Sequence, residues 1–209
     1  MYTAVIFDVD GTLIDSEETI LISLQKMLRL HYRREMSREE LAFVLGIPGA
    51  DALRQLGIAE VERALHCWTE YMKEFRHATR VFDGIHGLFE GLRGLPVLQG
   101  VVTSRTVQQF LDDFVPFGLL RDLPIDICAD DTKRHKPHPE PLLKFLELSL
   151  SAPENSIYIG DTIYDYECAR AAGVDFGLAL WGCKDPDAVP AQYKFKQPAD
   201  ILTLLTRKP

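Results

Sequence analysis

The chain has 209 residues, 46% of them hydrophobic and 26% charged, a balance typical of a globular protein with a sizeable core. Its net charge of −8, from 23 basic and 31 acidic residues, gives it no general electrostatic attraction to nucleic acid or anionic lipid. No apolar run approaches the length of a membrane span, and the first one ends at Asp8 without a preceding basic segment. We therefore expect a cytoplasmic protein with no membrane or nucleic-acid partner.

Short apolar runs predict the strands of a parallel sheet, because they are apolar on both faces and do not alternate with polar residues. The predicted strands cover residues 2–7, 100–103, 125–129, 156–160 and 176–180. Stretches with helical character lie between them and cover residues 85–93, 107–114, 139–149 and 164–172. This alternation predicts an α/β fold, a Rossmann-like doubly wound parallel sheet.

One long segment interrupts the alternation directly after the first strand. Residues 16–81 carry no strand signal, and their apolar residues recur at helical spacing in two stripes. The stripes are Ile20, Leu21, Leu24, Met27 and Leu28, and then Val61, Ala64, Leu65, Trp68, Tyr71, Met72 and Phe75. Ser37 with Glu40 predicts a capping box for a further helix. We expect a core domain of residues 1–15 and 82–209, with an inserted helical cap domain of residues 16–81.

Two aspartates directly follow the first predicted strand. Asp8 and Asp10 stand one residue apart, so their side chains point to the same side of an extended chain. Strands avoid aspartate, and the repulsion between two neighbouring carboxylates has to be offset. A cation is the simplest group that could offset it.

Polar side chains also follow other predicted strands. Thr103 and Ser104 follow the second strand, and Asp161 follows the fourth, with Asp165 four residues later. Lys136 lies just ahead of the helix that precedes the fourth strand. In open parallel sheets, ligands bind outside the carboxyl ends of the strands, where the strand order reverses. If the first strand is central, all these groups converge on one crevice.

The chemical types of these side chains are complementary. Aspartate oxygens suit Mg²⁺, which needs only one or two carboxylates besides waters and substrate oxygens. The Thr103 hydroxyl can hydrogen-bond an oxyanion, and Lys136 is a positive charge that can pair with both a carboxylate and a phosphate. A carboxylate nucleophile, a metal ion, a lysine and a hydroxyl are the parts that phosphoryl transfer requires.

In this order and spacing, four stretches resemble the four motifs of the haloacid dehalogenase-like hydrolase superfamily. They are Asp8-Val-Asp-Gly-Thr12, Thr103, Lys136-Pro, and Gly160-Asp-Thr-Ile-Tyr-Asp165. The helical insertion after the first motif resembles the C1-type cap of that superfamily. The likeness covers nearly the whole chain, and within the superfamily the chain is similar to the phosphoglycolate phosphatase and β-phosphoglucomutase-like branch.

The resemblance implies a role for each of these residues. Asp8 would be the nucleophile, and Asp10 would be the general acid for the leaving alcohol and then the general base for water. Lys136 would complete the catalytic group. The implied Mg²⁺ ligands are Asp8, Asp10 through its carbonyl, Asp161 and Asp165. The implied residues for binding the phosphoryl group are Thr103, Ser104 and Lys136.

The function that the resemblance implies is a Mg²⁺-dependent phosphatase, which hydrolyses a small phosphorylated metabolite through an aspartyl-phosphate. Two alternatives stay open, namely a sugar-phosphate mutase on the same core and a non-catalytic binding module that kept the fold. A C–Cl hydrolase is disfavoured, because it has no use for the second acid of the first motif or for a metal. The sequence does not predict the oligomeric state.

Several of these residues also have a purely structural interpretation. Asp161 and Asp165 can cap the helix that follows them, and Thr103 or Ser104 can be the N-cap of the helix at residues 107–114.

Other choices concern the lysine and the cap. Lys133 and Arg134 are rivals to Lys136, whose position before Pro137 favours it. The turn at residues 46–49 and Arg54 are expected to approach the crevice, as the loop between cap helices commonly does in this family.

Overall fold

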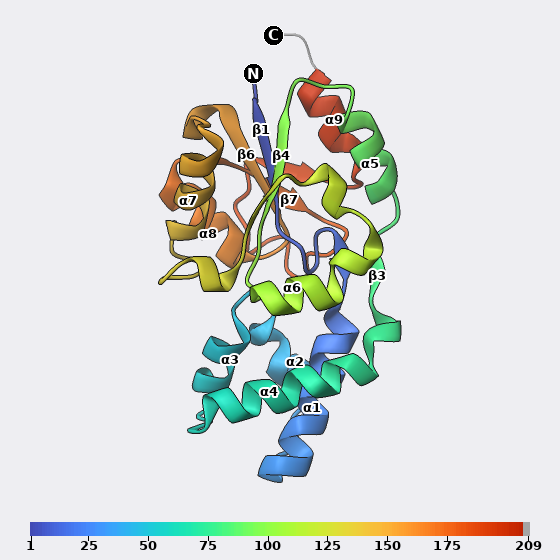
Figure 1. Ribbon diagram of the computed structural model, residues 1–209, viewed down its shortest axis with the longest axis vertical. Helices are drawn as coiled ribbons and strands as arrows, with labels where there is room; N and C mark the ends of the chain where they lie inside the picture. Colours follow the sequence, from blue (N-terminus) through green and yellow to red (C-terminus); the bar gives the residue numbers. More distant parts are fainter. Residues whose placement is uncertain (207–209) are drawn as a thin grey trace.

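The computed structural model describes residues 1–206, and within them six parallel strands form one sheet (Figure 1). In spatial order the strands are β5 (Ile125–Ile127), β4 (Leu98–Val102), β1 (Ala4–Phe7), β6 (Ser156–Gly160), β7 (Asp175–Ala179) and β8 (Tyr193–Phe195). The chain first winds from β1 towards β5 and then returns to build β6, β7 and β8 on the other side. The strand order therefore reverses at β1, and the predicted doubly wound fold is confirmed.

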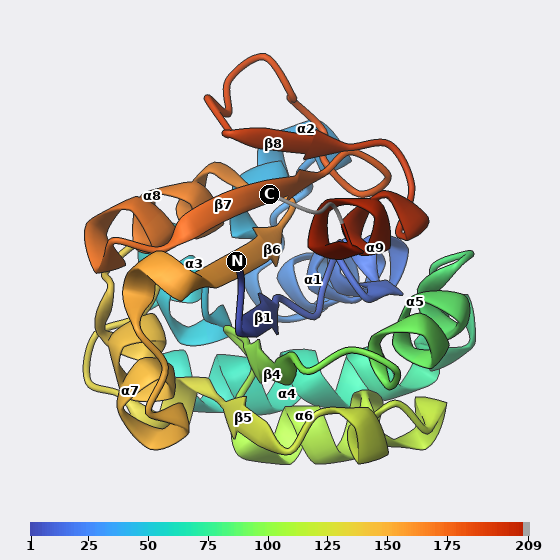
Figure 2. The same cartoon turned by 90° about the horizontal axis from the view of Figure 1, so that it is seen from above.

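Helices cover both faces of the sheet, as Figure 2 shows from above. On one face lie α5 (Ile85–Leu92), α6 (Val107–Asp113) and α9 (Ala199–Thr206), and on the other lie α7 (Glu140–Ser149) and α8 (Ile163–Ala172). Strand β1 serves both faces because successive side chains alternate. Val5 and Phe7 join the first hydrophobic cluster, whereas Ala4 and Ile6 join the second.

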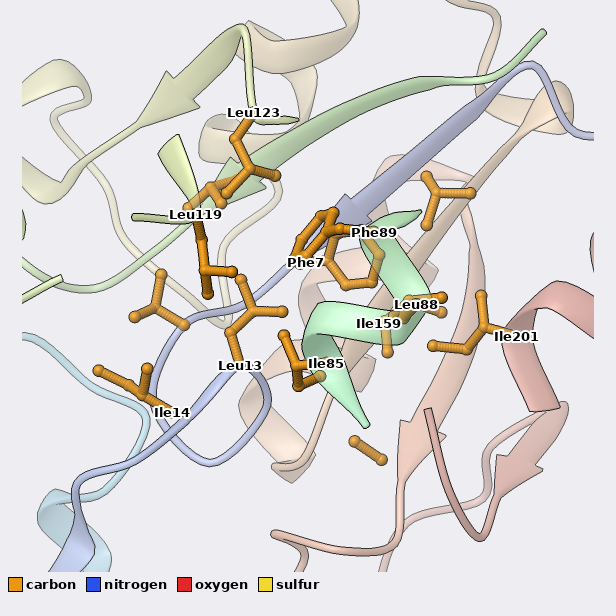
Figure 3. Packing of buried hydrophobic residues seen from close by; sticks show 14 of the residues in the cluster. Phe7, Leu13, Ile14, Ile85, Leu88, Phe89, Leu119, Leu123, Ile159 and Ile201 are labelled. Atoms are coloured by element: carbon orange, nitrogen blue, oxygen red, sulfur yellow. The ribbon is translucent and has the colours of Figure 1, made fainter. Parts of the chain in front are cut away.

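The first hydrophobic cluster fixes β1 against α5. Figure 3 shows Phe7 beside Phe89, and their ring centroids lie 5.5 Å apart in an edge-to-face arrangement. Both side chains are almost fully buried. Truncating a buried phenylalanine to alanine costs about 3–5 kcal/mol, so this contact holds firmly the strand whose end carries Asp8.

The segment of residues 16–81 forms a separate helical layer. Its helices are α1 (Glu17–Tyr32), α2 (Arg38–Leu41), α3 (Gly49–Gln55) and α4 (Val61–Glu74), and Trp68 lies in a hydrophobic cluster of their own. The capping box of Ser37 and Glu40 is present, as predicted. In Figure 1 this layer lies beyond the carboxyl ends of the sheet strands, at the end of the molecule opposite the N-terminus.

The prediction missed several short elements. Strands β2 (Ile14–Asp15) and β3 (Arg80–Val81) pair antiparallel where the chain enters and leaves the helical layer, so the expectation of no strand up to residue 81 is wrong at its end. Such two-residue strands are too short to show a periodicity. Single 3₁₀ turns lie at Ala42–Val44, Arg76–Ala78, Val115–Phe117, Leu120–Asp122, Ala129–Asp131 and Pro153–Asn155. Among residues 1–206, no helix combines the length and apolar character that crossing a membrane requires.

Candidate active site

The predicted site residues lie at the carboxyl end of the sheet, on the side of the helical layer. Asp8 follows β1, Thr103 follows β4 and Asp161 follows β6, and these three strands are neighbours. The Asp8 amide donates to the Ile159 carbonyl at 2.8 Å, and the Thr103 amide donates to the Ile127 carbonyl at 2.9 Å. The sheet hydrogen bonding therefore continues up to the residues that carry the polar side chains.

Lys136 is a buried cation that contacts two of the acids of this site. Its ammonium lies 2.9 Å from Asp8 Oδ1 and 2.7 Å from Asp165 Oδ1, and it donates to the Tyr158 hydroxyl at 3.1 Å. Only 4% of the residue is exposed. Although burial alone would lower the pKa of Lys136, the carboxylates of Asp165 and Asp8 raise it above its ordinary value. The rivals Lys133 and Arg134 are exposed, so the structure separates Lys136 from them.

Asp165 both caps a helix and contacts this lysine. Its Oδ2 accepts from the Thr162 amide at 3.1 Å and from the Thr162 hydroxyl at 2.6 Å, which completes a capping box at the start of α8. Its Oδ1 accepts from Lys136 and lies 3.0 Å from the Tyr158 hydroxyl. Both carboxylate oxygens therefore have partners, and Asp165 orients Lys136 towards Asp8.

Three carboxylates meet beside the lysine. Asp8, Asp161 and Asp165 each offer an oxygen within 4.8 Å of the others, and all three side chains are buried. Burial, together with the charges of Asp165 and Asp10, raises the pKa of Asp8 to about 7, although Lys136 acts in the opposite direction. The pKa of Asp161 is also raised, mainly by burial and by the charges of Asp165 and Asp8.

The donor chemistry of this group fits Mg²⁺. Its oxygen ligands are hard, and three carboxylates beside one ammonium leave negative charge uncompensated in a buried place. A divalent cation is the group that would neutralise this charge. The group thus fits the metal site that the sequence predicts. Asp8 and Asp161 would be ligands, because each keeps one carboxylate oxygen available for a metal ion.

Gly11 makes room for one of these acids. Its backbone has a φ of +75°, and a Cβ placed on it would lie 2.1 Å from Asp161 Oδ2. Any side chain at this position would therefore collide with the carboxylate and strain the backbone. The Thr12 hydroxyl donates to Asp161 Oδ1 at 3.2 Å and helps to fix its orientation.

Asp10 lies beside the three carboxylates but faces another partner. Arg105 binds it through two parallel hydrogen bonds of 2.8 and 2.6 Å, and the Ser16 hydroxyl donates to the same carboxylate. The third contact of Arg105 is to Asp113 Oδ2, at 2.9 Å. Burial tends to raise the pKa of Asp10, but the charge and hydrogen bonds of Arg105 outweigh burial and hold that pKa below its ordinary value.

Sequence reasoning missed Arg105. The available signal was a basic residue directly after Thr103 and Ser104, at the carboxyl end of a strand that already carried a motif. Nothing local identifies its partner, because Asp10 lies 95 residues earlier in the chain.

Thr103 and Ser104 differ in their contacts. The Thr103 hydroxyl is buried and accepts from the Arg105 amide at 3.2 Å, whereas the Ser104 hydroxyl donates to the Gly46 carbonyl at 3.0 Å. Thr106, and neither of these two, is the N-cap of α6, so the capping interpretation of Thr103 and Ser104 is wrong. No hydrogen bond links either hydroxyl to Asp8 among the residues the structure describes.

The helical layer closes over the site through the turn at residues 46–49. Gly46 touches the α/β part closely, since a Cβ on it would lie 2.9 Å from the Thr162 methyl group. Gly46 also lines both cavities that contain Asp10. Arg54 does not approach the site in this way. It pairs with Asp51 at 2.6 Å, and 62% of its side chain is exposed. In the described part of the chain it lines neither cavity.

Comparison with known proteins agrees with this geometry. Residues 5–179 match the model of the haloacid dehalogenase-like hydrolase family, and the chain belongs to that family. The predicted family and the prediction of a hydrolase are thereby confirmed.

Individual relatives carry more specific names. The chain is 27% identical over 207 residues to the pyrophosphatase PpaX of Bacillus mycoides (strain KBAB4), covering 97% of this chain and 96% of the relative. It is 28% identical over 213 residues to the phosphoglycolate phosphatase of Xylella fastidiosa (strain 9a5c), covering 97% and 91%. A solved structure from Lactobacillus plantarum, proposed to be a phosphoglycolate phosphatase, matches with a TM-score of 0.90 and 31% identity, covering 98% of this chain and 99% of the other.

Proposed function

We propose that this chain is a Mg²⁺-dependent phosphatase that hydrolyses small phosphomonoesters through an aspartyl-phosphate on Asp8. The observation that carries the proposal is the contact of 2.9 Å between the buried Asp8 carboxylate and the Lys136 ammonium, beside the second acid Asp161. These groups supply a nucleophile, a fixed cation and metal ligands at one point. The relatives named as a pyrophosphatase and a phosphoglycolate phosphatase support phosphoryl-group hydrolysis over other hydrolase chemistry.

In this proposal Mg²⁺ is held by Asp8, Asp161 and the Asp10 carbonyl, with Asp165 beside them. When bound, it supplies positive charge to the phosphoryl oxygens and keeps the Asp8 carboxylate ionised. Lys136 adds a second positive charge next to the attacking oxygen. Asp165 orients that lysine, and the Thr103 hydroxyl donates to the transferring phosphoryl group.

The reaction has two steps. An Asp8 oxygen forms a bond to phosphorus while the bond from phosphorus to the leaving oxygen breaks, and Asp10 gives its proton to the leaving alcohol. Water then attacks the same phosphorus, Asp10 takes a proton from it, and the bond to Asp8 breaks. Arg105 favours the ionised form of Asp10 that the second step needs, whereas an incoming anionic substrate favours the protonated form that the first step needs.

The proposal includes two domains and their closure. A core of residues 1–15 and 82–209 carries the chemistry, and a cap of residues 16–81 excludes bulk water when it closes. The paired strands β2 and β3 mark the two crossings between them, where we place the hinge. The Ser104–Gly46 hydrogen bond and the 2.9 Å ion pair of Arg76 with Asp113 hold the cap against the core.

The test is a screen of phosphate esters, including a generic aryl phosphate, with Mg²⁺ and with a chelator. We expect phosphate release that requires Mg²⁺ and falls by about 10⁴-fold or more in Asp8→Asn. The matched control is Glu147→Gln, the same chemical change on an exposed residue of α7, which should retain full activity. No release from any ester, or an active Asp8→Asn protein, would contradict the proposal.

Glucose 1-phosphate with a bisphosphate primer forms a further arm of the screen. Conversion to an isomeric sugar phosphate without phosphate release would assign the chain to the mutases instead. A protein that binds esters without converting them would be a binding module.

A further inference from the structure

A cavity of about 350 Å³ opens beside the catalytic acids. It is lined by Asp10 and Asp161 at its inner end and extends between α1, the turn before α3 and residues 181–189. Asp10, the proposed proton donor to the leaving group, lines this cavity and also a smaller one that contains Asp8. A leaving group too large for the smaller cavity would therefore extend into this space. Cavities of about 300–1,000 Å³ hold drug-sized ligands, so the space far exceeds the few atoms of glycolate.

The walls of this cavity are mainly aromatic and aliphatic. Ile20 and Leu45 come from the helical layer, and Phe82, Tyr164 and Trp181 come from the α/β part. The indole N–H of Trp181 already donates to the Thr12 carbonyl at 2.9 Å. What Trp181 offers to a ligand is therefore carbon surface and a ring face, which favour stacking with a ring.

The charges of the cavity do not suit an anion. Among residues 1–206, Lys184 is the only lysine or arginine in the cavity lining, and it forms an ion pair of 2.5 Å with Glu17. Asp15 and Asp185 line the same space and add negative charge. A second anionic group on the substrate would compete with Glu17 for Lys184 and remain close to two further carboxylates.

The neighbouring cavity offers no other cation. Asp8, Trp68 and Met72 line this space of about 60 Å³, and Arg105 is its only basic lining residue in the described part of the chain. Arg105 already binds Asp10 and Asp113. Its charge is therefore committed to two carboxylates.

The following inference rests on the proposed function. We infer that the substrate is a phosphomonoester whose leaving group is uncharged and carries a ring, such as a sugar or a nucleoside. The small anions that a phosphoglycolate phosphatase or a pyrophosphatase would release do not fit the charge, the size or the walls of the cavity. The chain then differs in substrate class from the relatives that carry those names.

The experiment compares kcat/KM, with Mg²⁺ present, for esters that differ in charge and size. Adenosine 5′-monophosphate and glucose 6-phosphate have uncharged ring leaving groups, glycerol 3-phosphate has a small uncharged one, and phosphoglycolate and pyrophosphate release anions. We expect the better ring ester to exceed both anionic substrates by at least about tenfold, which corresponds to about 1.4 kcal/mol of binding. A preference for either anionic substrate would overturn the inference while leaving the phosphatase proposal intact.

Variants at Trp181 and Glu17 test the residues behind the preference. Trp181→Ala should lower kcat/KM for the ring esters about tenfold but leave glycerol 3-phosphate nearly unchanged, and Trp181→Phe should restore most of the loss. Glu17→Gln frees Lys184 and should raise kcat/KM for phosphoglycolate several-fold. Glu18→Gln, the same change at the neighbouring exposed residue of α1, should not. The inference would be contradicted if the Trp181 variants changed kcat/KM equally for all esters. It would also be contradicted if Glu17→Gln left kcat/KM for phosphoglycolate unchanged.

A binding measurement separates this inference from the reaction itself. The Asp8→Asn protein with Mg²⁺ is titrated with the same esters, and binding is followed by tryptophan fluorescence. Tighter binding of the ring esters is expected even if turnover fails for every ester. Absent turnover would sink the proposed function, whereas tighter binding of phosphoglycolate would sink the inference about the substrate class.

Discussion

The crevice has two walls, a sheet wall from the α/β part and a helical wall from the helical layer, and they are built differently. On the sheet side, Asp8, Lys136 and Asp165 are buried charges, each fixed by direct contacts between charged groups. On the helical side, Ile20 and Trp68 present apolar surface. Most ion pairs of that side lie in solvent, where each contributes about 1 kcal/mol or less.

The difference reflects what each wall has to do. Charge that develops on a phosphoryl group is stabilised only by charges already fixed in position, so the sheet wall can change little without losing its chemistry. A leaving group needs only a matching shape and polarity, so the helical wall can vary. Changes at the buried charges of the sheet wall should therefore abolish turnover, whereas changes at the apolar residues that line the cavity, from either wall, should alter selectivity.

The largest effect is expected for Lys136→Met. The substitution removes the cation between Asp8 and Asp165 and leaves two buried carboxylates without it. We expect a loss of turnover of 10³-fold or more, from the removal of a fixed charge at the phosphoryl group. We also expect a decrease of about 3–5 kcal/mol in the free energy of unfolding, measured by urea denaturation without metal.

Lys133→Met is the control for that substitution. Lys133 is exposed, so the same change three residues earlier should alter the free energy of unfolding by less than about 0.5 kcal/mol and preserve turnover. Similar losses of turnover and of stability in both variants would show that the buried position of Lys136 has no particular effect. That result would contradict the difference between the two walls.

A smaller effect is expected for Arg105→Lys. Lysine keeps the charge but loses the planar fork that makes two hydrogen bonds to Asp10. Asp10 should then be less well placed for proton transfer, and kcat should fall about 10²-fold with a smaller change in KM. The pKa of Asp10 should rise, moving to higher pH the limb of the pH–rate profile that Asp10 sets. An unchanged profile would show that Arg105 only packs against the sheet.

The stabilisation by Mg²⁺ should depend on pH in a stated direction. Burial and Asp165 raise the pKa of Asp8 to about 7, well above the value of about 3.9 expected in the unfolded chain. Between these values the folded state binds more protons, so the metal-free protein loses stability as pH rises through about 7. Because Mg²⁺ binds ionised carboxylates, the rise in Tm on adding it should be larger at pH 8 than at pH 6.

Thermal unfolding with and without saturating MgCl₂ at the two pH values measures this difference. The rise should reach several degrees at pH 8, as expected for a ligand at about 100 times its dissociation constant. Asp8→Asn, which lacks the titrating group, should show a smaller difference between the two pH values. A larger shift at pH 6 would contradict the charge balance assigned to the site.

The smallest effect is expected for Arg54→Ala in the helical layer. Arg54 pairs with Asp51 at the surface, and pairs of this kind contribute about 0.3–0.5 kcal/mol. Its removal should leave the relative rates on the different phosphate esters unchanged. A changed ester preference would bring Arg54 back to the crevice, as the sequence had predicted, and would require movement of α3.

The sequence predicted the sheet wall better than the helical wall, and the reason is physical. Two of the acids, Asp8 and Asp161, directly follow buried strands, and Lys136 precedes a helix. The apolar runs of these strands and of this helix are strong signals. Once the strand order is known, the carboxyl ends of neighbouring strands must meet. The choice of Lys136 over Lys133 followed from its position before a proline and a helix, and Lys136 is the one that is buried.

Other features depend on contacts that no local pattern encodes. Arg105 meets Asp10 across the sheet, and Phe82 and Trp181 meet Ile20 at the cavity although they lie far apart in the chain. Strand β8 is an edge strand of three residues with a lysine in its middle, which gives little apolar signal. The sequence therefore indicated the residues of the candidate site, but the shape of the cavity beside them required the structure.

The most direct test of the central claim follows the phosphoryl group itself. The protein is mixed with Mg²⁺ and a hydrolysed ester, quenched in acid during turnover and mapped by mass spectrometry of its peptides. We predict the added mass of one phosphoryl group on the peptide that contains Asp8, and no such mass in Asp8→Asn. Turnover with no phosphorylated peptide, or with the phosphoryl group on another residue, would contradict the account.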